Sequence, residues 1–394
     1  MSFSSEEKKL ILIQSFYFFA VALADIFVTV FFFSHGTFQT PVLYQIIRIW
    51  VFLGIFILSG LIFNKVRSGT IIKIGLFIFA VFYFFLFLLK ERSITYIIPL
   101  SVLNGVAMGC FWSGYNLNQY IYSNQKKRIS FFGSSLIAIQ LFQSIAPFLG
   151  GAIITTTSSR YSLRVGYGVL FLAVSVIIAL IIFLVGKLPD HERLTFSISH
   201  IFSHRRTLVW KKILLQQFFL GMFDMPGNTI VGILIYLVIK KEFLLGITQT
   251  ASVLISILGT LLAIRLLHKS SRFYWIGIVG ISLGYFVFGL FQSPKGVLLY
   301  IILIGLTSPF MNTWVPTVYY RAMDSVSGHW KEKYHLLFER DVSLAFGRLF
   351  SYTLIFLFIH PSNQITLARY AVFLLPIPPL LLGFALREEK TKKL

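Results

Sequence analysis

Long apolar segments recur along the whole chain, and this feature constrains the fold more than any other. Each segment is long enough to cross roughly 30 Å of hydrocarbon, so we interpret them as membrane-spanning helices. The composition agrees, because only 12% of the residues are charged, whereas soluble domains average about 25%. The twelve predicted spans of this all-α integral membrane protein lie near residues 10–33, 42–63, 70–89, 94–120, 131–155, 165–186, 212–239, 246–267, 273–292, 296–319, 342–360 and 368–387.

The formal net charge of +21 reflects membrane topology rather than nucleic-acid binding. The 35 Lys and Arg residues lie mostly in short segments between spans, where they can also attract anionic lipid headgroups. Most of them fall on one side of the membrane if the N-terminus is cytoplasmic, as the positive-inside rule requires. No cleavable signal peptide is evident. We therefore expect a multi-pass monomer in the plasma (inner) membrane, with both termini cytoplasmic and no nucleic-acid partner.

The two halves of the chain repeat each other. FFAVALAD ends at Asp25 and FFLGMFD ends at Asp224, each in the first span of its half. Trp112 and Trp314 hold matching places in the two fourth spans, and a polar, basic loop separates the halves. We therefore predict two pseudo-symmetric six-helix bundles. The predicted units are an N-terminal bundle (1–186), a cytoplasmic central loop (187–211) and a C-terminal bundle (212–394).

Two six-span bundles joined by a basic loop, with both ends inside, resemble the major facilitator superfamily over essentially the whole chain. Between its second and third spans this family carries a Gly, an Asp four residues later, basic residues and a further Gly. The matching stretch here is GLIFNKVRSG, in which Asn64 takes the acidic place. This change removes a charged contact to a neighbouring helix end at the inner gate. The stretch GCFWSGYNLN is also similar to uncharacterised bacterial members of the family.

The stretch APFLGG in the fifth span resembles the glycine-proline element of exporters in the family. Pro147 frees a backbone carbonyl, and Gly150 and Gly151 allow a neighbouring helix to approach closely. The alternative interpretation is a generic kinked and tightly packed helix. Ser101 stands where many antiporters of the family carry an arginine, which weighs against export.

Asp25 is a carboxylate inside an otherwise apolar span. Ionisable side chains in such places are costly, and they usually mark transport pathways or proton relays. Arg48 lies at a similar depth in the second span and could pair with Asp25. One interpretation is a static ion pair that joins two helices. The other is a protonatable carboxylate whose partner changes during a transport cycle, since burial and a nearby arginine act oppositely on its proton affinity.

Asp224 is the stronger candidate for a proton-coupling residue. It lies near the middle of the seventh span, where transporter folds place their sites, and no basic residue of its half is clearly at the same depth. Pro226 and Gly227 follow it and predict a break in the helix, which is tolerated only beside protein or a water-filled cavity. Asn228 adds a hydrogen-bonding side chain. The alternative is a protonated aspartic acid with a purely structural role.

Other polar side chains within the spans are candidates for lining a substrate cavity. Arg348 could attract an anionic substrate, or else extend towards the inner surface or pair with Asp341. The amides Asn104, Gln140 and Gln143 have interhelical hydrogen bonding as their default role. Asn104 and Gln143 come nearest the expected midplane, so they are the preferred cavity residues.

Three aromatic residues, Trp112, Tyr115 and Trp314, fall near the cytoplasmic ends of the fourth and tenth spans. Tryptophan and tyrosine favour the membrane interface in any case. Such a position is also compatible with an inner gate, to which we assign these three residues together with Asn64.

These features predict a proton-coupled secondary transporter that works by alternating access and exports an amphipathic compound. An uptake symporter for a small metabolite, a lipid translocator and a non-transporting membrane scaffold or sensor are the alternatives. The sequence shows no P-loop, acid pair or metal-binding helix, so we expect no enzymatic activity, no cofactor and no metal site. The expected partners are a small-molecule substrate, protons and the lipid bilayer.

Overall fold

The computed structural model describes residues 4–123, 128–185, 194, 196–203, 206–326, 333–359 and 362–386. Within these ranges every regular element is a helix, and twelve helical segments are long and apolar enough to cross a membrane, which confirms the predicted fold class. The α-helices are α1 (Ser5–His35), α2 (Gln39–Ile62), α3 (Ser68–Leu89), α4 (Ile97–Tyr122), α5 (Arg128–Arg160), α6 (Leu163–Val185), α7 (Ile198–Ser203), α8 (Leu208–Ile239), α9 (Glu242–Lys269), α10 (Tyr274–Leu290), α11 (Pro294–Ser325), α12 (Tyr334–Phe358), α13 (Gln364–Ala371) and α14 (Ile377–Ala385). Short 3₁₀ helices are η1 (Lys90–Ile94), η3 (Ser271–Phe273) and η5 (Val372–Leu374).

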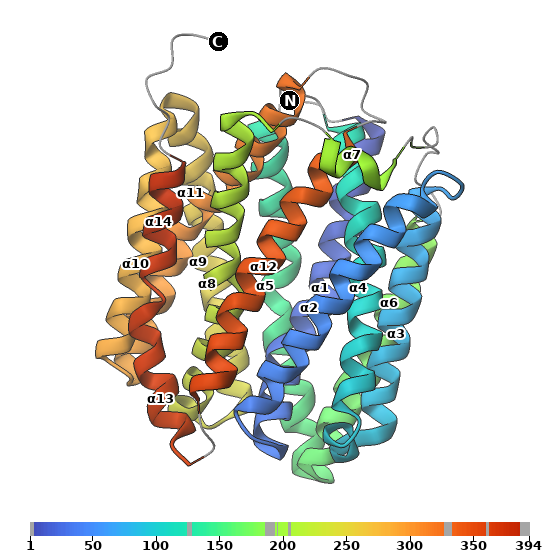
Figure 1. Ribbon diagram of the computed structural model, residues 1–394. Helices are drawn as coiled ribbons and strands as arrows, with labels where there is room; N and C mark the ends of the chain where they lie inside the picture. The colour runs from blue at the N-terminus through green and yellow to red at the C-terminus, as the bar shows by residue number, and fades with distance from the viewer. Residues whose placement is uncertain are drawn as a thin grey trace.

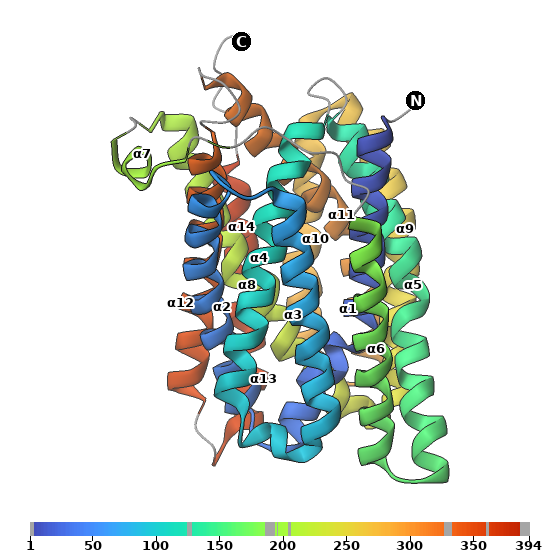
Figure 2. The same cartoon turned by 90° about the vertical axis from the view of Figure 1, so that its right-hand side faces the viewer.

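The long helices stand side by side, and α1 begins at the same end of the molecule where α14 finishes (Figure 1). We call this the terminal end and the opposite one the distal end. Helices α1 to α6 pack on one another, as do α8 to α14. The two sets meet through α5 with α9, α2 with α12 and α1 with α8. Figure 2 shows the short helix α7 at the terminal end, where it contacts α12.

Several helices extend beyond the apolar segments that predicted them. Helix α8 begins at Leu208, because the Thr207 hydroxyl caps it by accepting a hydrogen bond from the Trp210 N–H at 3.2 Å. Helix α12 begins at Tyr334, within a stretch that the sequence predicted as loop. The predicted central loop contains α7, and its predicted end at residue 211 falls inside α8. Its other boundary, at residues 186–187, lies outside the described residues.

Helix α8 crosses α12 at very short distance because both carry glycine at the crossing. Gly221 lies against the α12 backbone at Leu344, and Gly347 lies against the α8 backbone at Phe218. A side chain at either glycine would collide with a carbonyl oxygen. Small residues at such positions are the usual way in which membrane helices approach each other closely.

The predicted break after Asp224 does not occur, because α8 continues through Pro226 and Gly227. Proline cannot donate a hydrogen bond to the carbonyl four residues earlier, which here is that of Met222. The Ser351 hydroxyl of α12 donates to this carbonyl at 2.8 Å. Ser343 donates in the same way to another α8 carbonyl, at 2.5 Å. Helix α12 therefore supplies the hydrogen bond that α8 lacks, and the helix stays regular.

The APFLGG stretch is where α5 packs against two other helices. Gly150 faces the Leu23 carbonyl of α1, and a Cβ atom on Gly151 would lie 2.8 Å from the Glu242 carbonyl oxygen of α9. The Phe148 N–H donates to the Thr250 hydroxyl of α9 at 3.2 Å. This stretch therefore forms part of the contact between the two sets of helices.

Candidate functional site

Two cavities lie between the two sets of helices and share part of their lining. The central cavity, of about 500 Å³, is lined by α1 to α5, α8, α11 and α12. The distal cavity, of about 400 Å³, is lined by α1, α2, α5, α8, α9 and α11. Both volumes suit small-molecule ligands. The residues that line both cavities are Phe18, Val21, Asp25, Arg48 and Met225. The two charged members of this set are therefore accessible from both cavities.

Asp25 lies in the middle part of α1, and its side chain is exposed to the cavities. In the described part of the chain, its carboxylate has neither a hydrogen-bond donor nor an ion-pair partner. The Thr29 hydroxyl donates to the backbone carbonyl of Asp25, at 3.3 Å, and not to the carboxylate. A carboxylate held inside a membrane protein without a partner carries a high energetic cost. Such a group points to a function that needs it free.

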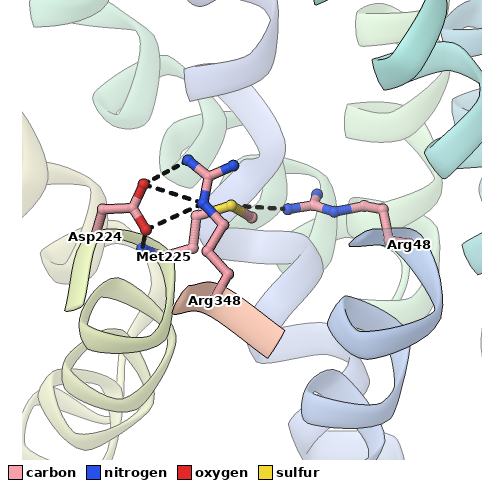
Figure 3. A network of polar contacts seen from close by, with 4 residues as sticks. All are labelled: Arg48, Asp224, Met225 and Arg348. Atoms are coloured by element: carbon pink, nitrogen blue, oxygen red, sulfur yellow. Dashed lines mark hydrogen bonds and ion pairs between the residues drawn. The ribbon is translucent and has the colours of Figure 1, made fainter. Parts of the chain in front are cut away.

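Arg48 extends from α2 towards the other set of helices, where its Nη2 atom lies 3.9 Å from the Met225 sulfur of α8 (Figure 3). Its guanidinium carbon lies 5.4 Å from the centre of the Tyr44 ring, and its Nε atom has no hydrogen-bond partner among the described residues. The ion pair with Asp25 that the sequence allowed does not form in this structure. The guanidinium is instead engaged with a thioether across the interface, although the side chain is only 9% exposed.

Asp224 does have a basic partner at its own depth, contrary to the sequence prediction. The Nε atom of Arg348, in α12, donates to both carboxylate oxygens of Asp224 at 3.1 Å, and Nη2 donates to the second oxygen (Figure 3). The Met225 N–H also donates to this carboxylate, at 2.5 Å. Arg348 lines the central cavity, whereas Asp224 is not among the residues that line it. Helical register in α12 and the close α8–α12 crossing bring the two together.

Arg348 does not pair with Asp341, because that carboxylate is bound by its neighbour. Arg340 donates from Nη2 to Asp341 at 2.6 Å, and its guanidinium lies 4.5 Å from the centre of the Tyr319 ring. Asn116 of α4 donates to the same carboxylate from the other set of helices, at 3.3 Å. Arg340 and Asp341 line the central cavity on its terminal side. This cluster therefore joins the two halves on the terminal side of the central cavity.

The sequence did not identify Arg340 or Asn116 as site residues. The available signal was the charged triplet ERD at the start of an apolar segment, which we interpreted as loop. No feature of the sequence marked Met225 as a site residue, because a methionine in an apolar span looks like any other core residue.

The intramembrane amides separate into two groups. Asn104 lines the central cavity, and its buried Oδ1 atom has no hydrogen-bond donor in the described residues. Gln143 and Asn228 line the distal cavity. Gln140 instead joins α5 to α9, since it donates to the Ser256 hydroxyl and accepts from that of Thr260, both at 2.8 Å. Gln140 thus lies at a helix contact and outside both cavities.

The aromatic residues assigned to the inner gate do not form one cluster. Trp112 lines the central cavity and packs edge-on against Tyr115. Tyr115 is fully buried and donates to the Gln14 side chain at 2.5 Å. Trp314, on α11, lies under the Arg321 guanidinium at 5.5 Å. At the terminal end, hydrogen bonds and ring contacts instead join α4 to α11.

Asn64 makes a contact that its sequence position did not suggest. Its side-chain N–H group donates to the Phe196 carbonyl at 2.9 Å, and its oxygen accepts from the Phe196 N–H at 3.0 Å. An amide carries both a donor and an acceptor, so it pairs with one backbone residue in a way that a carboxylate cannot. Gly60 lies against the rings of Phe196 and Tyr334 in the same region. The α2 end is therefore attached to the segment that precedes α7.

A sequence pattern of the Major Facilitator Superfamily matches residues 74–334, which is more than half of the chain. The uncharacterised protein YqgE of Bacillus subtilis (strain 168) is 23% identical over 347 residues, covering 87% of this chain and 80% of the relative. The crystal structure of the human organic anion transporter MFSD10 has a TM-score of 0.68 at 12% identity, covering 98% of this chain and 100% of that one. The Escherichia coli fucose:proton symporter FucP has a TM-score of 0.63 at 14% identity, covering 97% and 99%. The identities to these structures show the fold alone. The chain therefore belongs to the Major Facilitator Superfamily, a family of secondary transporters and not of enzymes.

Proposed function

We propose that this transporter exchanges protons for a small amphipathic compound, which it exports, and that Asp25 is the residue that binds the proton. The observation that carries the proposal is the position of Asp25. Its carboxylate lines both cavities and has no partner in the described chain. A group in that position can receive a proton from one side and release it to the other when the cavities open in turn.

Asp25 takes precedence over Asp224 because the second carboxylate is already neutralised. Arg348 and the Met225 N–H together fill the acceptor positions of Asp224. Protonation would have to break these charge-assisted hydrogen bonds, which are among the stronger ones in proteins. Protonation of Asp25 breaks none. We therefore assign the Asp224–Arg348 pair a structural role beside the cavity.

Export follows if the substrate and the proton compete for one carboxylate. A compound with a cationic group would bind Asp25 at the cytoplasmic side and would be displaced by a proton at the other side. We assign the cytoplasmic side to the terminal end, because most Lys and Arg residues of the connecting segments lie there. The contact made by APFLGG between α5 and α9 suits the exporter interpretation. Uptake by symport is the alternative, and Ser101 favours it because it stands where many antiporters of the family carry an arginine; its hydroxyl donates to the Ile97 carbonyl of the same helix.

Proton movement in proteoliposomes with a trapped pH dye tests the proposal. The probes are aromatic amines, aromatic amino acids and short aromatic peptides added outside. Exchange raises the lumenal pH when a probe enters, whereas symport lowers it. Asp25→Asn cannot bind the proton, so we expect its probe-evoked proton flux to fall at least about tenfold.

Two further variants make the test specific. Glu91→Gln removes an acid at the distal end and serves as the matched control, with a flux equal to wild type. Asp224→Asn should keep a proton response per folded molecule. Probe transport by Asp25→Asn with an unchanged proton flux would contradict the proposal.

A further inference from the structure

Most of the described charged residues around the central cavity form ion pairs, but two of them do not. Arg340 binds Asp341, and Arg348 binds Asp224. Asp25 and Arg48 line the same cavity but bind neither each other nor another ion in the described chain. The site therefore presents one negative and one positive charge that attract each other without being in contact, and their sum is zero.

We infer that the boundary between the two cavities binds a zwitterion, with the cationic group of the ligand at Asp25 and its anionic group at Arg48. This inference rests on the proposed transport function and specifies its substrate class. A ligand with one charge would leave the other protein charge uncompensated, and a neutral ligand would leave both. Uncompensated charges inside a membrane-spanning bundle are costly even where they line a cavity, so a ligand with both charges is preferred.

The contacts of Arg48 show how the anionic group would be received. Among the described residues its Nη2 atom contacts the Met225 sulfur, which is a weak acceptor, and its guanidinium also interacts with Tyr44. Met225 has a flexible, unbranched side chain that can move away at low cost. A carboxylate in place of the sulfur would give Arg48 a charge-assisted hydrogen bond.

The remaining walls fit an apolar or aromatic body. On the central side the cavity is lined by rings that include Tyr17, Phe52, Phe79 and Phe82. Tyr17 stacks on Phe111 at 3.9 Å between ring centroids, so this wall is held in place by packing. The ligand would thus have two opposite charges close together and an apolar part directed into the central cavity.

Binding would also act on the contact between the two halves. Asp25 and Arg48 belong to α1 and α2, whereas Met225 belongs to α8. A ligand that displaces the sulfur replaces the Arg48–Met225 contact between the two halves with a contact between Arg48 and the ligand. Exchange of one proton for one zwitterion also moves one net positive charge per cycle, while exchange for a monovalent cation moves none. Transport should therefore respond to membrane potential.

Binding to the purified full chain in detergent tests the inference with matched probes of equal aromatic content. These are phenylalanine and the dipeptide Phe-Phe, each as the zwitterion, the cationic methyl ester and the anionic N-acetyl form. We expect the zwitterion of at least one of the two to bind about 10- to 100-fold more tightly than either of its blocked forms.

Variants of the two charged residues separate their contributions. Arg48→Gln should remove the advantage of the zwitterion over the ester, whereas Asp25→Asn should remove its advantage over the N-acetyl form. Arg48→Lys keeps the charge and should keep the preference, which guards against a misfolded Gln variant. Arg265→Gln, an exposed arginine of α9 outside both cavities, is the matched control.

Equal binding of zwitterion and ester, no binding of any form, or an unchanged preference in Arg48→Gln would overturn the inference. Its failure is distinguishable from failure of the proposed function. A retained zwitterion preference without proton flux would refute proton coupling alone. Proton flux with a monovalent cation, insensitive to an imposed potassium diffusion potential, would refute the substrate class alone.

Discussion

The two arginines near the middle of the molecule differ in what holds them. Arg348 is bound to a carboxylate through three hydrogen bonds, and the two side chains are 13% and 23% exposed. Arg48 is more deeply buried but faces a thioether and an aromatic ring. The first residue is stabilised where it lies, while the second is available to a ligand.

Removal of one partner of the Asp224–Arg348 pair should therefore destabilise the fold. We expect Asp224→Asn and Arg348→Gln each to lower the free energy of unfolding by about 3 kcal/mol, because each leaves a charge uncompensated. The double variant should recover most of this loss, since it leaves no charge behind. Denaturant unfolding in detergent measures the free energy of unfolding of the wild type, the two single variants and the double variant. Additive losses in the double variant would show that the pair has no such role.

The sequence identified Asp25, Arg48, Asp224 and Arg348 as exceptional, since each is an ionisable residue in an apolar segment. It did not identify their partners. Pairing depends on how each helix is rotated about its axis and on which helix lies beside it, and neither is encoded in the local pattern. For this reason the sequence favoured Asp224 as the proton-binding residue, whereas the pairing of Asp224 with Arg348 in the structure favours Asp25.

At the scale of the elements, helix ends are determined by polar contacts more than by hydropathy. Helix α12 begins in a charged stretch, where buried Glu339 accepts hydrogen bonds from Trp210 at 2.8 Å and from Arg206 at 3.1 Å. Apolar periodicity therefore predicted where each helix crosses the membrane but not where it begins. The contacts that stabilise these ends come from residues far away in the sequence.

The hydrogen bonds between Asn64 and Phe196 attach the central segment to the end of α2, which leads to a measurable expectation. Asn64→Ala removes two hydrogen bonds, so local opening should become roughly tenfold more frequent. Limited proteolysis of the segment between α6 and α8 should accelerate accordingly. Asn64→Asp should behave similarly, because its carboxylate faces the Phe196 carbonyl.

Asn363→Ala, at the distal end, is the matched control for this measurement. Cleavage of Asn64→Ala at the wild-type rate would mean that the central segment is held by other contacts.

At the scale of the whole molecule, contacts join the two halves at both ends. At the terminal end, Tyr320 donates to the Gln119 side chain at 3.1 Å, and its ring stacks on Tyr120. At the distal end, the Phe38 N–H donates to the Gln364 side chain at 2.8 Å. The cavities therefore lie between two layers of contacts. The sequence repeat predicted the architecture, but the relative position of the halves depends on contacts such as these.

The hydrogen bonds that α12 donates to α8 have a consequence for the transport cycle. Separation of the two helices would strand the Met222 carbonyl, which Pro226 cannot satisfy, and would expose the Asp224–Arg348 pair. Spin labels at Leu208 and Leu357, on these two helices, should therefore keep one separation with and without ligand. Labels at Leu61, on α2, and Leu357 should change theirs, and a change in the first pair would contradict the argument.

We therefore expect α8 and α12 to move together as one body, and the change in position to occur between this pair and α2. A substrate that displaces the Met225 sulfur from Arg48 would act directly at this boundary, because Arg48 belongs to α2 and Met225 to α8. The proposed cycle would then need two preformed bodies to turn against each other, without the unwinding of any helix.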